Sequence, residues 1–344
     1  MKNYILYGAV KSREKIVNDY VARQDGGGQV IGWVDSNPAK WNDAEKIFSP
    51  DLIKNYPDAA VVIMSDKIKA IAKYIRSKGY KNEILVYPGF RYPCFWNFSD
   101  DEKILNDWCK ENQQKIIDIY QKDSYTQKLL KEFFAERLAP NFEFIPIEKM
   151  IGYSHDNLYF YDRDIAPKGD LTYVNAGAYD GDTIEEFYLE YGDRLKKVYA
   201  FEPDSQNMAN LEIRMQKLNL QDIVEKMPFG LYDSDKTLFF KASGSQESFI
   251  TDEGDVSIEV RKLDSVISEV KGTLCISLDV EGSEIPALDG MKETIKKYRP
   301  YLAICIYHKL NDVLAVPMKI KEICPDYDFY IRCGVHMECY AVPK

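Results

Sequence analysis

Three carboxylates stand close together where a short apolar segment of the chain ends. The expected strand 274–279 ends in Asp279, and Glu281 and Glu284 follow it. Carboxylates this close raise one another's pKa unless a cation or hydrogen bonds compensate, which suits acid–base chemistry or a divalent metal ion. The next expected strand, 301–307, leads into His308, whose neutral imidazole would accept a hydroxyl proton. We expect Asp279 and His308 to be catalytic, or alternatively Asp279 with Glu281 or Glu284 to bind a metal.

A glycine-bearing loop lies earlier in the chain, between an expected strand and an expected helix. It reads Asn-Ala-Gly-Ala-Tyr-Asp-Gly-Asp-Thr over residues 175–183. Its glycines, Gly177 and Gly181, would let the backbone approach a ligand that a side chain would exclude. The following strand ends in Glu202, at a position where a carboxylate accepts hydrogen bonds from the ribose hydroxyls of a nucleoside. The two features together predict a site for a ligand that contains a nucleoside.

An alternation of strands and helices positions these segments. The expected strands are 171–175, 197–201, 223–231, 274–279, 301–307, 328–333 and 337–342, with a local hairpin of 237–241 and 256–262. The expected helices are 183–191, 207–218, 285–298 and 315–324. Parallel strands present their carboxyl ends at one edge of a sheet, so we expect the candidate residues to meet at that edge.

The first ninety residues alternate in the same way and predict a smaller parallel α/β domain over 1–90. Gly8 and Asp35 imitate a dinucleotide fingerprint, but the turn lacks the second and third glycines of that motif, so standard pyrophosphate binding is not expected. Residues 11–13, at the start of the first expected helix, would instead bind a single anionic group. An aromatic and helical connector (91–150) and a larger domain (151–344) complete the predicted organisation.

Composition excludes several classes of protein. The 344 residues carry a net charge of −10, which argues against general binding to nucleic acid or to anionic membranes. No apolar run approaches the roughly 20 residues of a membrane-spanning helix. The seven cysteines show no C-x-x-C spacing and the chain starts without a signal-peptide core, so a cytoplasmic protein with reduced thiols is expected. The sequence gives no oligomeric state.

The order of motifs from about 171 to 342 resembles the FkbM family of S-adenosylmethionine-dependent methyltransferases. The shared motifs are AGAYDGDT (176–183), YAFEPD (199–204), KLDSV (262–266), LDVEGSE (278–284) and YHK (307–309). The resemblance implies a class I methyltransferase fold, with a seven-stranded Rossmann-like sheet and a reversed final hairpin. It also implies S-adenosylmethionine as the cofactor and methyl transfer to a hydroxyl of a small-molecule or carbohydrate acceptor, in polysaccharide or glycoconjugate synthesis.

The resemblance also implies which residues hold the cofactor. The loop would line its methionine part, Glu202 would bind the ribose, and Asp279 would face the transferred methyl group. The implied set is Asn175, Gly177, Ala178, Tyr179, Gly181, Asp182, Thr183, Glu202, Pro203, Leu231 and Asp279. Two residues depart from the family pattern, since Asn175 stands for the usual Asp and Ser277 for the usual Lys. Restoring the charge with Asn175→Asp is therefore expected to tighten cofactor binding.

Two other functions stay open at this point. A binding or scaffold protein would keep the fold without turnover, and Asn175 and Ser277 are the evidence for it. A nicotinamide-dependent sugar-nucleotide enzyme would use the N-terminal domain, which its incomplete fingerprint disfavours. That domain resembles the small Rossmann-like domain found before sugar acyltransferases, and aromatic residues in 87–96 and 153–161 would suit either stacking on sugars or packing.

Overall fold

The computed structural model describes residues 2–8, 14–23, 26–65, 67–87, 102–138, 144–149, 159–160, 162–241, 249–251, 256–333 and 337–344. The chain divides into two compact units, residues 1–110 with 131–155 and residues 111–130 with 156–344. The residues of the expected connector (91–150) are shared between these two units. Its residues 111–130 belong to the second unit, because the Tyr120 hydroxyl donates to the Val313 carbonyl (2.9 Å) and the Thr126 hydroxyl to the Ile331 carbonyl (3.3 Å).

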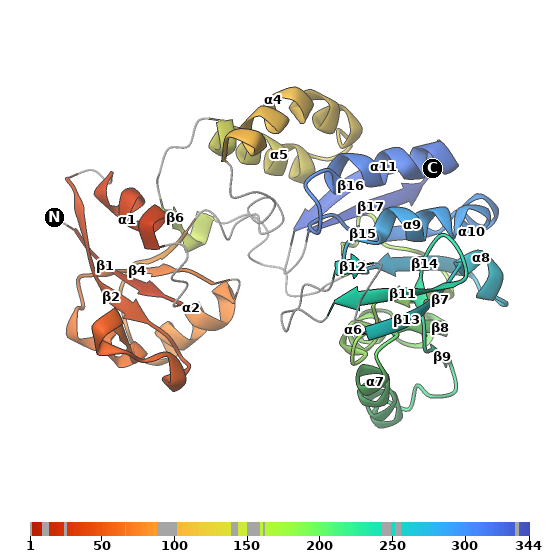
Figure 1. The fold of residues 1–344 in the computed structure, drawn as a ribbon, viewed down its shortest axis with the longest axis horizontal. Coiled ribbons are helices and arrows are strands. Elements are labelled where there is room, and N and C mark those ends of the chain that lie inside the picture. Colours follow the sequence, from red (N-terminus) through yellow and green to blue (C-terminus); the bar gives the residue numbers. More distant parts are fainter. Residues whose placement is uncertain are drawn as a thin grey trace. The chain divides into compact units, whose positions relative to one another are not determined.

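The first unit contains a six-stranded sheet in the order β3-β2-β1-β4-β5-β6 (Figure 1). Its strands are β1 (Lys2–Tyr7), β2 (Gly28–Val34), β3 (Ile47–Phe48), β4 (Ala60–Ile63), β5 (Ile84–Val86) and β6 (Ile145–Pro146). Its helices include α1 (Glu14–Ala22), α2 (Ile68–Ser77) and the 3-10 helix η4 (Pro50–Asn55). All neighbouring strands are parallel except β5 and β6. The predicted smaller parallel α/β fold is confirmed, and the short antiparallel edge strand β6 is an addition to it.

The second unit is built on a seven-stranded sheet in the order β16-β17-β15-β14-β7-β8-β9, with helices on both faces (Figure 1). The strands are β7 (Leu171–Ala176), β8 (Leu195–Phe201), β9 (Val224–Met227), β14 (Thr273–Leu278), β15 (Tyr301–Cys305), β16 (Tyr327–Cys333) and β17 (Met337–Pro343). Its whole helices include α6 (Asp182–Tyr191), α7 (Ser205–Lys217), α9 (Glu284–Asp289), α10 (Lys292–Tyr298) and α11 (Asp312–Ile323). The unit also contains the part of α4 (Glu102–Ile119) from residue 111 onward and the part of α5 (Ser124–Leu138) up to residue 130. Strand β17 runs antiparallel to both its neighbours. The predicted sheet with a reversed final hairpin is confirmed.

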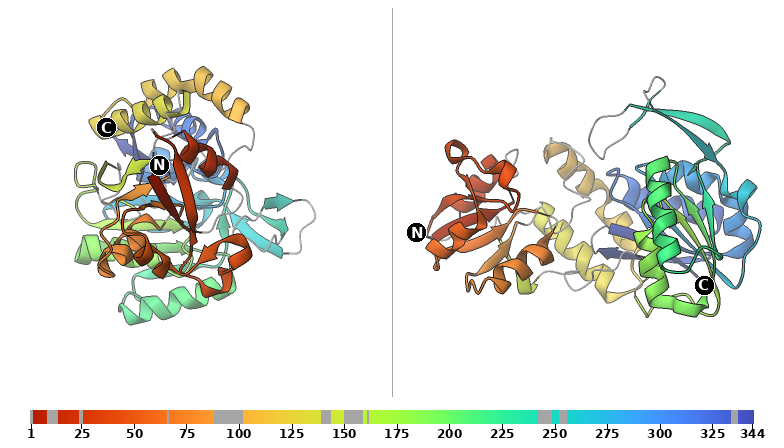
Figure 2. Two further views of the ribbon diagram at one scale, coloured as in Figure 1. Left: turned by 90° about the vertical axis from the view of Figure 1, so that its left-hand side faces the viewer. Right: turned by 90° about the horizontal axis from the view of Figure 1, so that it is seen from below.

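Two expected elements are each divided in the structure. The strand expected at 223–231 is interrupted by Pro228, which has no N–H to continue a ladder. Its second part, β10 (Gly230–Leu231), joins a four-stranded sheet with β11 (Lys236–Lys241), β12 (Phe249–Thr251) and β13 (Val256–Arg261), which stands out from the larger sheet (Figure 2). The helix expected at 285–298 divides into α9 and α10 at Gly290, where a Cβ atom would lie 1.8 Å from the Tyr232 carbonyl oxygen.

Within the described ranges, none of the helices combines the length and the apolar character that a bilayer crossing requires.

Candidate active site

The carboxyl ends of four neighbouring strands bring the candidate residues together. Strand β7 lies between β8 and β14, and β14 pairs in parallel with β15. Backbone hydrogen bonds continue beyond the strand ends. The Asp279 N–H donates to the Ala176 carbonyl (3.0 Å), and the Ala178 N–H donates to the Phe201 carbonyl (3.0 Å). The glycine loop, the Glu202 turn and the acidic segment are therefore held against one another by backbone hydrogen bonds.

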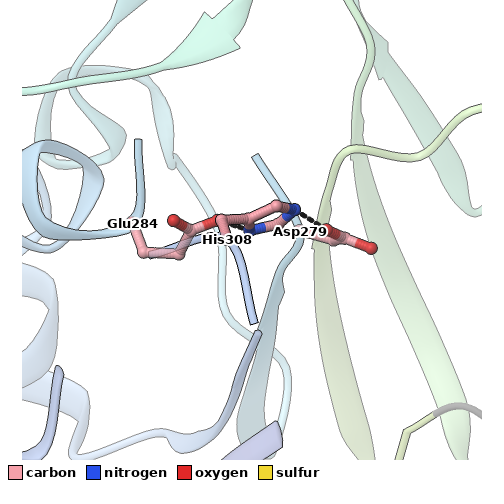
Figure 3. A group of neighbouring side chains, drawn as sticks. All are labelled: Asp279, Glu284 and His308. Atoms are coloured by element: carbon pink, nitrogen blue, oxygen red, sulfur yellow. Dashed lines mark ion pairs between the residues drawn. The ribbon is translucent and has the colours of Figure 1, made fainter. Parts of the chain in front are cut away.

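His308 lies between carboxylates on both sides of its ring (Figure 3). Its Nε2 is 3.3 Å from Asp279 Oδ1 and 3.4 Å from Glu281 Oε2, and its Nδ1 is 3.0 Å from Glu284 Oε1. The imidazole side chain is 10% exposed and that of Glu284 only 1%. Neither ring nitrogen has a well-aligned hydrogen bond, so these contacts are chiefly ion pairs. The predicted meeting of His308 with Asp279 is thus present in the structure.

The charge of His308 depends on the carboxylates around it. Burial lowers the pKa of its imidazole, but Glu281, Glu284 and Asp279 together outweigh burial and raise that pKa to about 10. The surrounding carboxylates therefore favour the imidazolium form of His308 in the resting site, and the neutral imidazole expected from the sequence stays a prediction. Three carboxylates surround one cation, which leaves an excess of negative charge at the site.

Asp279, Glu284 and His308 each offer one donor atom within 4.8 Å of the others, a spacing compatible with a metal ion. Glu281, expected as a ligand from the sequence, is outside that group. The imidazolium occupies the position between the carboxylates and already supplies positive charge there. A metal would have to displace the proton of His308.

The pH dependence of stability follows from this ion-pair cluster. The folded-state pKa of His308 is raised above its ordinary value of 6.5, so its protonation stabilises the fold fully below pH 6.5. That stability is lost as the pH rises through 10. We expect the unfolding free energy of the wild type to fall by about 1–3 kcal/mol more than that of His308→Gln between neutral pH and pH 10. Urea denaturation at several pH values measures this difference, and identical pH profiles would contradict it.

Two tyrosines that the sequence did not single out contact Asp279. The Tyr307 hydroxyl donates to both carboxylate oxygens, at 3.0 and 3.1 Å. The centroid of the Tyr307 ring lies 4.1 Å from that of the His308 ring. The Tyr159 hydroxyl lies 3.5 Å from Asp279 Oδ2. Strand β15 ends at Cys305, so residues 307 and 308 lie beyond it. The alternation of side chains between the two faces of a strand therefore does not apply to them. The YHK motif was a signal for Tyr307, whereas nothing in the sequence links Tyr159 to Asp279.

Glu202 is buried and held by the loop it was expected to accompany. Its Oε2 accepts the Tyr179 N–H and its Oε1 the Asp204 N–H, both at 2.9 Å. Burial raises the pKa of Glu202, and these backbone donors oppose that effect. The two N–H groups fix the orientation of the carboxylate, while each oxygen retains capacity for a further hydrogen bond.

The two loop glycines are required by the packing of the protein itself. Gly177 has a φ of +85°, and a Cβ atom there would lie 2.0 Å from the Asp279 carbonyl oxygen. Gly181 also has a φ of +85°, and its Cβ would meet Met215 at 3.0 Å and Leu211 at 3.2 Å on α7. Packing alone therefore requires glycine at both positions, and the expectation that these glycines also let a ligand approach stays a prediction.

The two departures from the family pattern are direct neighbours. Asn175 and Ser277 are register partners on β7 and β14, and Asn175 Nδ2 lies 3.1 Å from Ser277 Oγ. The same amide nitrogen lies 2.8 Å from the Tyr173 hydroxyl and 2.9 Å from the Thr183 hydroxyl, and Tyr173 contacts Ser277 at 2.7 Å. The four side chains form one buried, uncharged network that joins β7, β14 and the start of α6.

This network changes the expected result of Asn175→Asp. The position is 1% exposed, and the network that contacts it contains no cation, so a carboxylate there would be buried without a counter-charge. We expect the variant to lose about 1–3 kcal/mol of unfolding free energy, measured by urea denaturation. Adding Ser277→Lys supplies the cation and should recover part of that loss. Wild-type stability of the single variant would contradict this account.

The remaining predicted cofactor residues have separate surroundings. Ala178 and Leu231 are buried, whereas Tyr179 is 58% exposed with a φ of +46°. Asp182 and Thr183 begin α6, and Pro203 follows Glu202 in the turn after β8. In the first unit, Asp35 accepts the Asn37 N–H (2.9 Å) and pairs with Lys40 (3.0 Å), so its carboxylate stabilises a turn. Residues 11–13, 88–96, 153–158 and 161 lie outside the described residues.

Comparison with known proteins relates this site to a family. Residues 175–324 match the family model described as the methyltransferase FkbM domain. The structure of methyltransferase FkbM from Methylobacillus flagellatus KT is 18% identical, with 99% of this chain and 90% of that chain covered and a TM-score of 0.59. The structure of a precorrin-6y C5,15-methyltransferase from Geobacter metallireducens GS-15 is 11% identical, with 52% of this chain and 84% of that chain covered and a TM-score of 0.32. The structure of a SAM dependent methyltransferase from Aquifex aeolicus is 14% identical, with 52% of this chain and 85% of that chain covered and a TM-score of 0.31. Comparison with curated proteins gave no sequence match.

The matched segment contains the glycine loop, Glu202, the acidic cluster and His308. The structure supplies the sheet on which the family's motifs were expected to lie, with the reversed hairpin at its edge. Residues 175–324 of the second unit therefore match the methyltransferase FkbM domain on the fold of such enzymes, and the chain is an S-adenosylmethionine-dependent methyltransferase.

Proposed function

We propose that the chain transfers the methyl group of S-adenosylmethionine to a hydroxyl oxygen of a carbohydrate or another small molecule. The observation that carries this proposal is the cluster of Asp279, Glu281 and Glu284 around His308. Its excess negative charge favours a sulfonium ligand nearby and leaves a carboxylate able to take the proton that the acceptor hydroxyl loses.

Glu202 is the residue proposed to bind the cofactor's ribose. The two backbone N–H groups that hold it leave lone pairs for the ribose hydroxyls. The loop 175–183 and Leu231 complete the proposed binding region, in the positions that the family resemblance implies. Bound there, S-adenosylmethionine supplies an electrophilic methyl group.

Glu202→Ala is expected to weaken S-adenosylmethionine binding by about 1–3 kcal/mol, because buried ribose hydroxyls lose a charged acceptor. Isothermal titration calorimetry measures the change. Glu225→Ala is the control, since Glu225 lies on the neighbouring strand β9 and pairs at the surface with Lys197 (2.7 Å). Equal affinity of a folded Glu202→Ala variant would remove the ribose assignment.

Asp279 is the proposed proton acceptor, with His308 as its charged partner. Methyl transfer forms the bond between carbon and the acceptor oxygen, breaks the bond between carbon and sulfur, and passes the hydroxyl proton to the carboxylate. This version needs no metal, so activity should survive EDTA. Activity that EDTA abolishes and Mg²⁺ restores would instead assign Asp279 and its neighbouring carboxylates to a metal ion.

A carbohydrate is the proposed acceptor, on the strength of the family resemblance and the net charge of −10, which disfavours nucleic acid. Tritiated S-adenosylmethionine, incubated with glucose, mannose, rhamnose and their methyl glycosides, tests the class directly. A short RNA serves as the alternative acceptor. Label in a sugar supports the proposal, and label in the RNA alone contradicts it.

Reduced thiols favour a cytoplasmic location for this reaction. All six described cysteines are free, and five of them are buried.

The two other functions are less well supported by the contacts. Asn175 and Ser277 were the evidence for a binding protein without turnover, but they belong to one hydrogen-bonded network rather than to a damaged charge pair. A nicotinamide enzyme would use the N-terminal domain, whose turn after β1 lacks the second and third glycines of the dinucleotide fingerprint.

A further inference from the structure

We propose that Tyr307 is a positioning residue for methyl transfer, whose hydroxyl holds the Asp279 carboxylate in the orientation that accepts the substrate proton. The inference rests on the proposed function of Asp279 and adds a residue that the sequence motifs did not assign.

The geometry places the Tyr307 hydroxyl between the two oxygens of one carboxylate. It lies 3.0 Å from Oδ1 and 3.1 Å from Oδ2, so one proton is shared between both acceptors. Burial raises the pKa of Tyr307, and the neighbouring Cys305 and Asp279 raise it further, so the hydroxyl retains its proton. Asp279 thus has a permanent neutral donor on one side.

His308 engages the same carboxylate from the adjacent position in the chain. Its Nε2 is 3.3 Å from Asp279 Oδ1, and its ring lies 4.1 Å from that of Tyr307 with a tilt of 41°. Removal of the tyrosine hydroxyl takes away a donor shared by both oxygens, and the charged imidazolium then attracts the carboxylate more strongly than the Tyr159 hydroxyl, 3.5 Å from Oδ2, does. A tighter ion pair with His308 would change the orientation of the carboxylate, so the tyrosine keeps the two groups at their observed separation.

The Tyr307→Phe variant tests this role first without any substrate. The chain has three histidines, so the ¹³Cε1 signal of His308 in labelled protein is assigned by comparison with His308→Gln. We expect Tyr307→Phe to shift that signal because Asp279 moves against the ring. Tyr327→Phe is the matched control, since it removes a buried hydroxyl that donates to the Pro300 carbonyl (2.9 Å). An unchanged His308 signal in a folded Tyr307→Phe protein overturns the proposal.

Kinetics with the labelled sugar panel provide the second readout. Tyr307→Phe should lower kcat about 10- to 100-fold and leave the KM for S-adenosylmethionine unchanged, as misplacement of a reacting group does. In an Asp279→Asn background the same change should cause no further loss, because the carboxylate to be positioned is gone. Losses that multiply in the double variant, or an unchanged kcat, contradict positioning through Asp279. If no sugar is labelled, the proposed acceptor fails, and the NMR comparison still decides the role of Tyr307.

Discussion

Replacing Asp279 by asparagine is expected to slow methyl transfer by about 100-fold or more, the usual contribution of a general base. The amide keeps the size of the side chain and the hydrogen bond from Tyr307 but cannot take the hydroxyl proton. Radiolabel transfer under saturating cofactor measures the rate. Glu225→Gln is the control, because Glu225 is a surface carboxylate on β9 that pairs with Lys197 and lies outside the cluster.

The same site gives a stricter test when both partners are removed. The double variant Asp279→Asn, His308→Ala lacks the proposed proton acceptor and the cation beside it. It should be no faster than Asp279→Asn alone, since the two groups act as a unit. A double variant that methylates its acceptor at the wild-type rate would show that neither residue takes part in the chemistry.

Gly177→Ala is expected to destabilise the second unit by about 2–5 kcal/mol. The φ of +85° costs an L-residue about 1–2 kcal/mol, and the overlap of the new methyl group with the Asp279 carbonyl oxygen adds about 1–3 kcal/mol. Thermal and urea denaturation of the purified protein measure the loss.

A second glycine separates the two causes of that loss. Gly169 has a similar φ of +75°, but a Cβ atom there meets nothing within 4 Å. Gly169→Ala should therefore show the backbone strain alone and retain most of the stability. Equal losses at the two positions would mean that the contact with Asp279 contributes nothing, and that Gly177 is replaceable by packing adjustments.

Much of the fold was predictable because buried parallel strands are short apolar runs between helices. The seven-stranded sheet and its reversed final hairpin followed from the family resemblance, and the strand pairing confirms both. Local breaks were harder to predict. Pro228 and Gly290 are visible in the sequence, but apolar residues continue on both sides of each, and only tertiary contacts such as that of Gly290 with Tyr232 make the break necessary.

The site was predictable where position along a strand decides it. Asp279 and His308 both follow neighbouring strands, so the topology alone brings them to one edge. Which side chains face one another across neighbouring strands depends on the strand register, which a single sequence does not fix. The register of β7 and β14 pairs Asn175 with Ser277, so the two departures from the family pattern form one hydrogen-bonded network. The proton on His308 depends on distances to three carboxylates, which spacing in the chain does not specify.

Calorimetric titration of the whole chain with S-adenosylmethionine, in parallel with NAD, tests the central claim most directly. The account predicts saturable binding of S-adenosylmethionine that Glu202→Ala weakens about 10- to 100-fold, the equivalent of one lost charged hydrogen-bond acceptor. It predicts no comparable heat from NAD. Binding of NAD without binding of S-adenosylmethionine, in protein shown to be folded, would contradict the assignment as a methyltransferase.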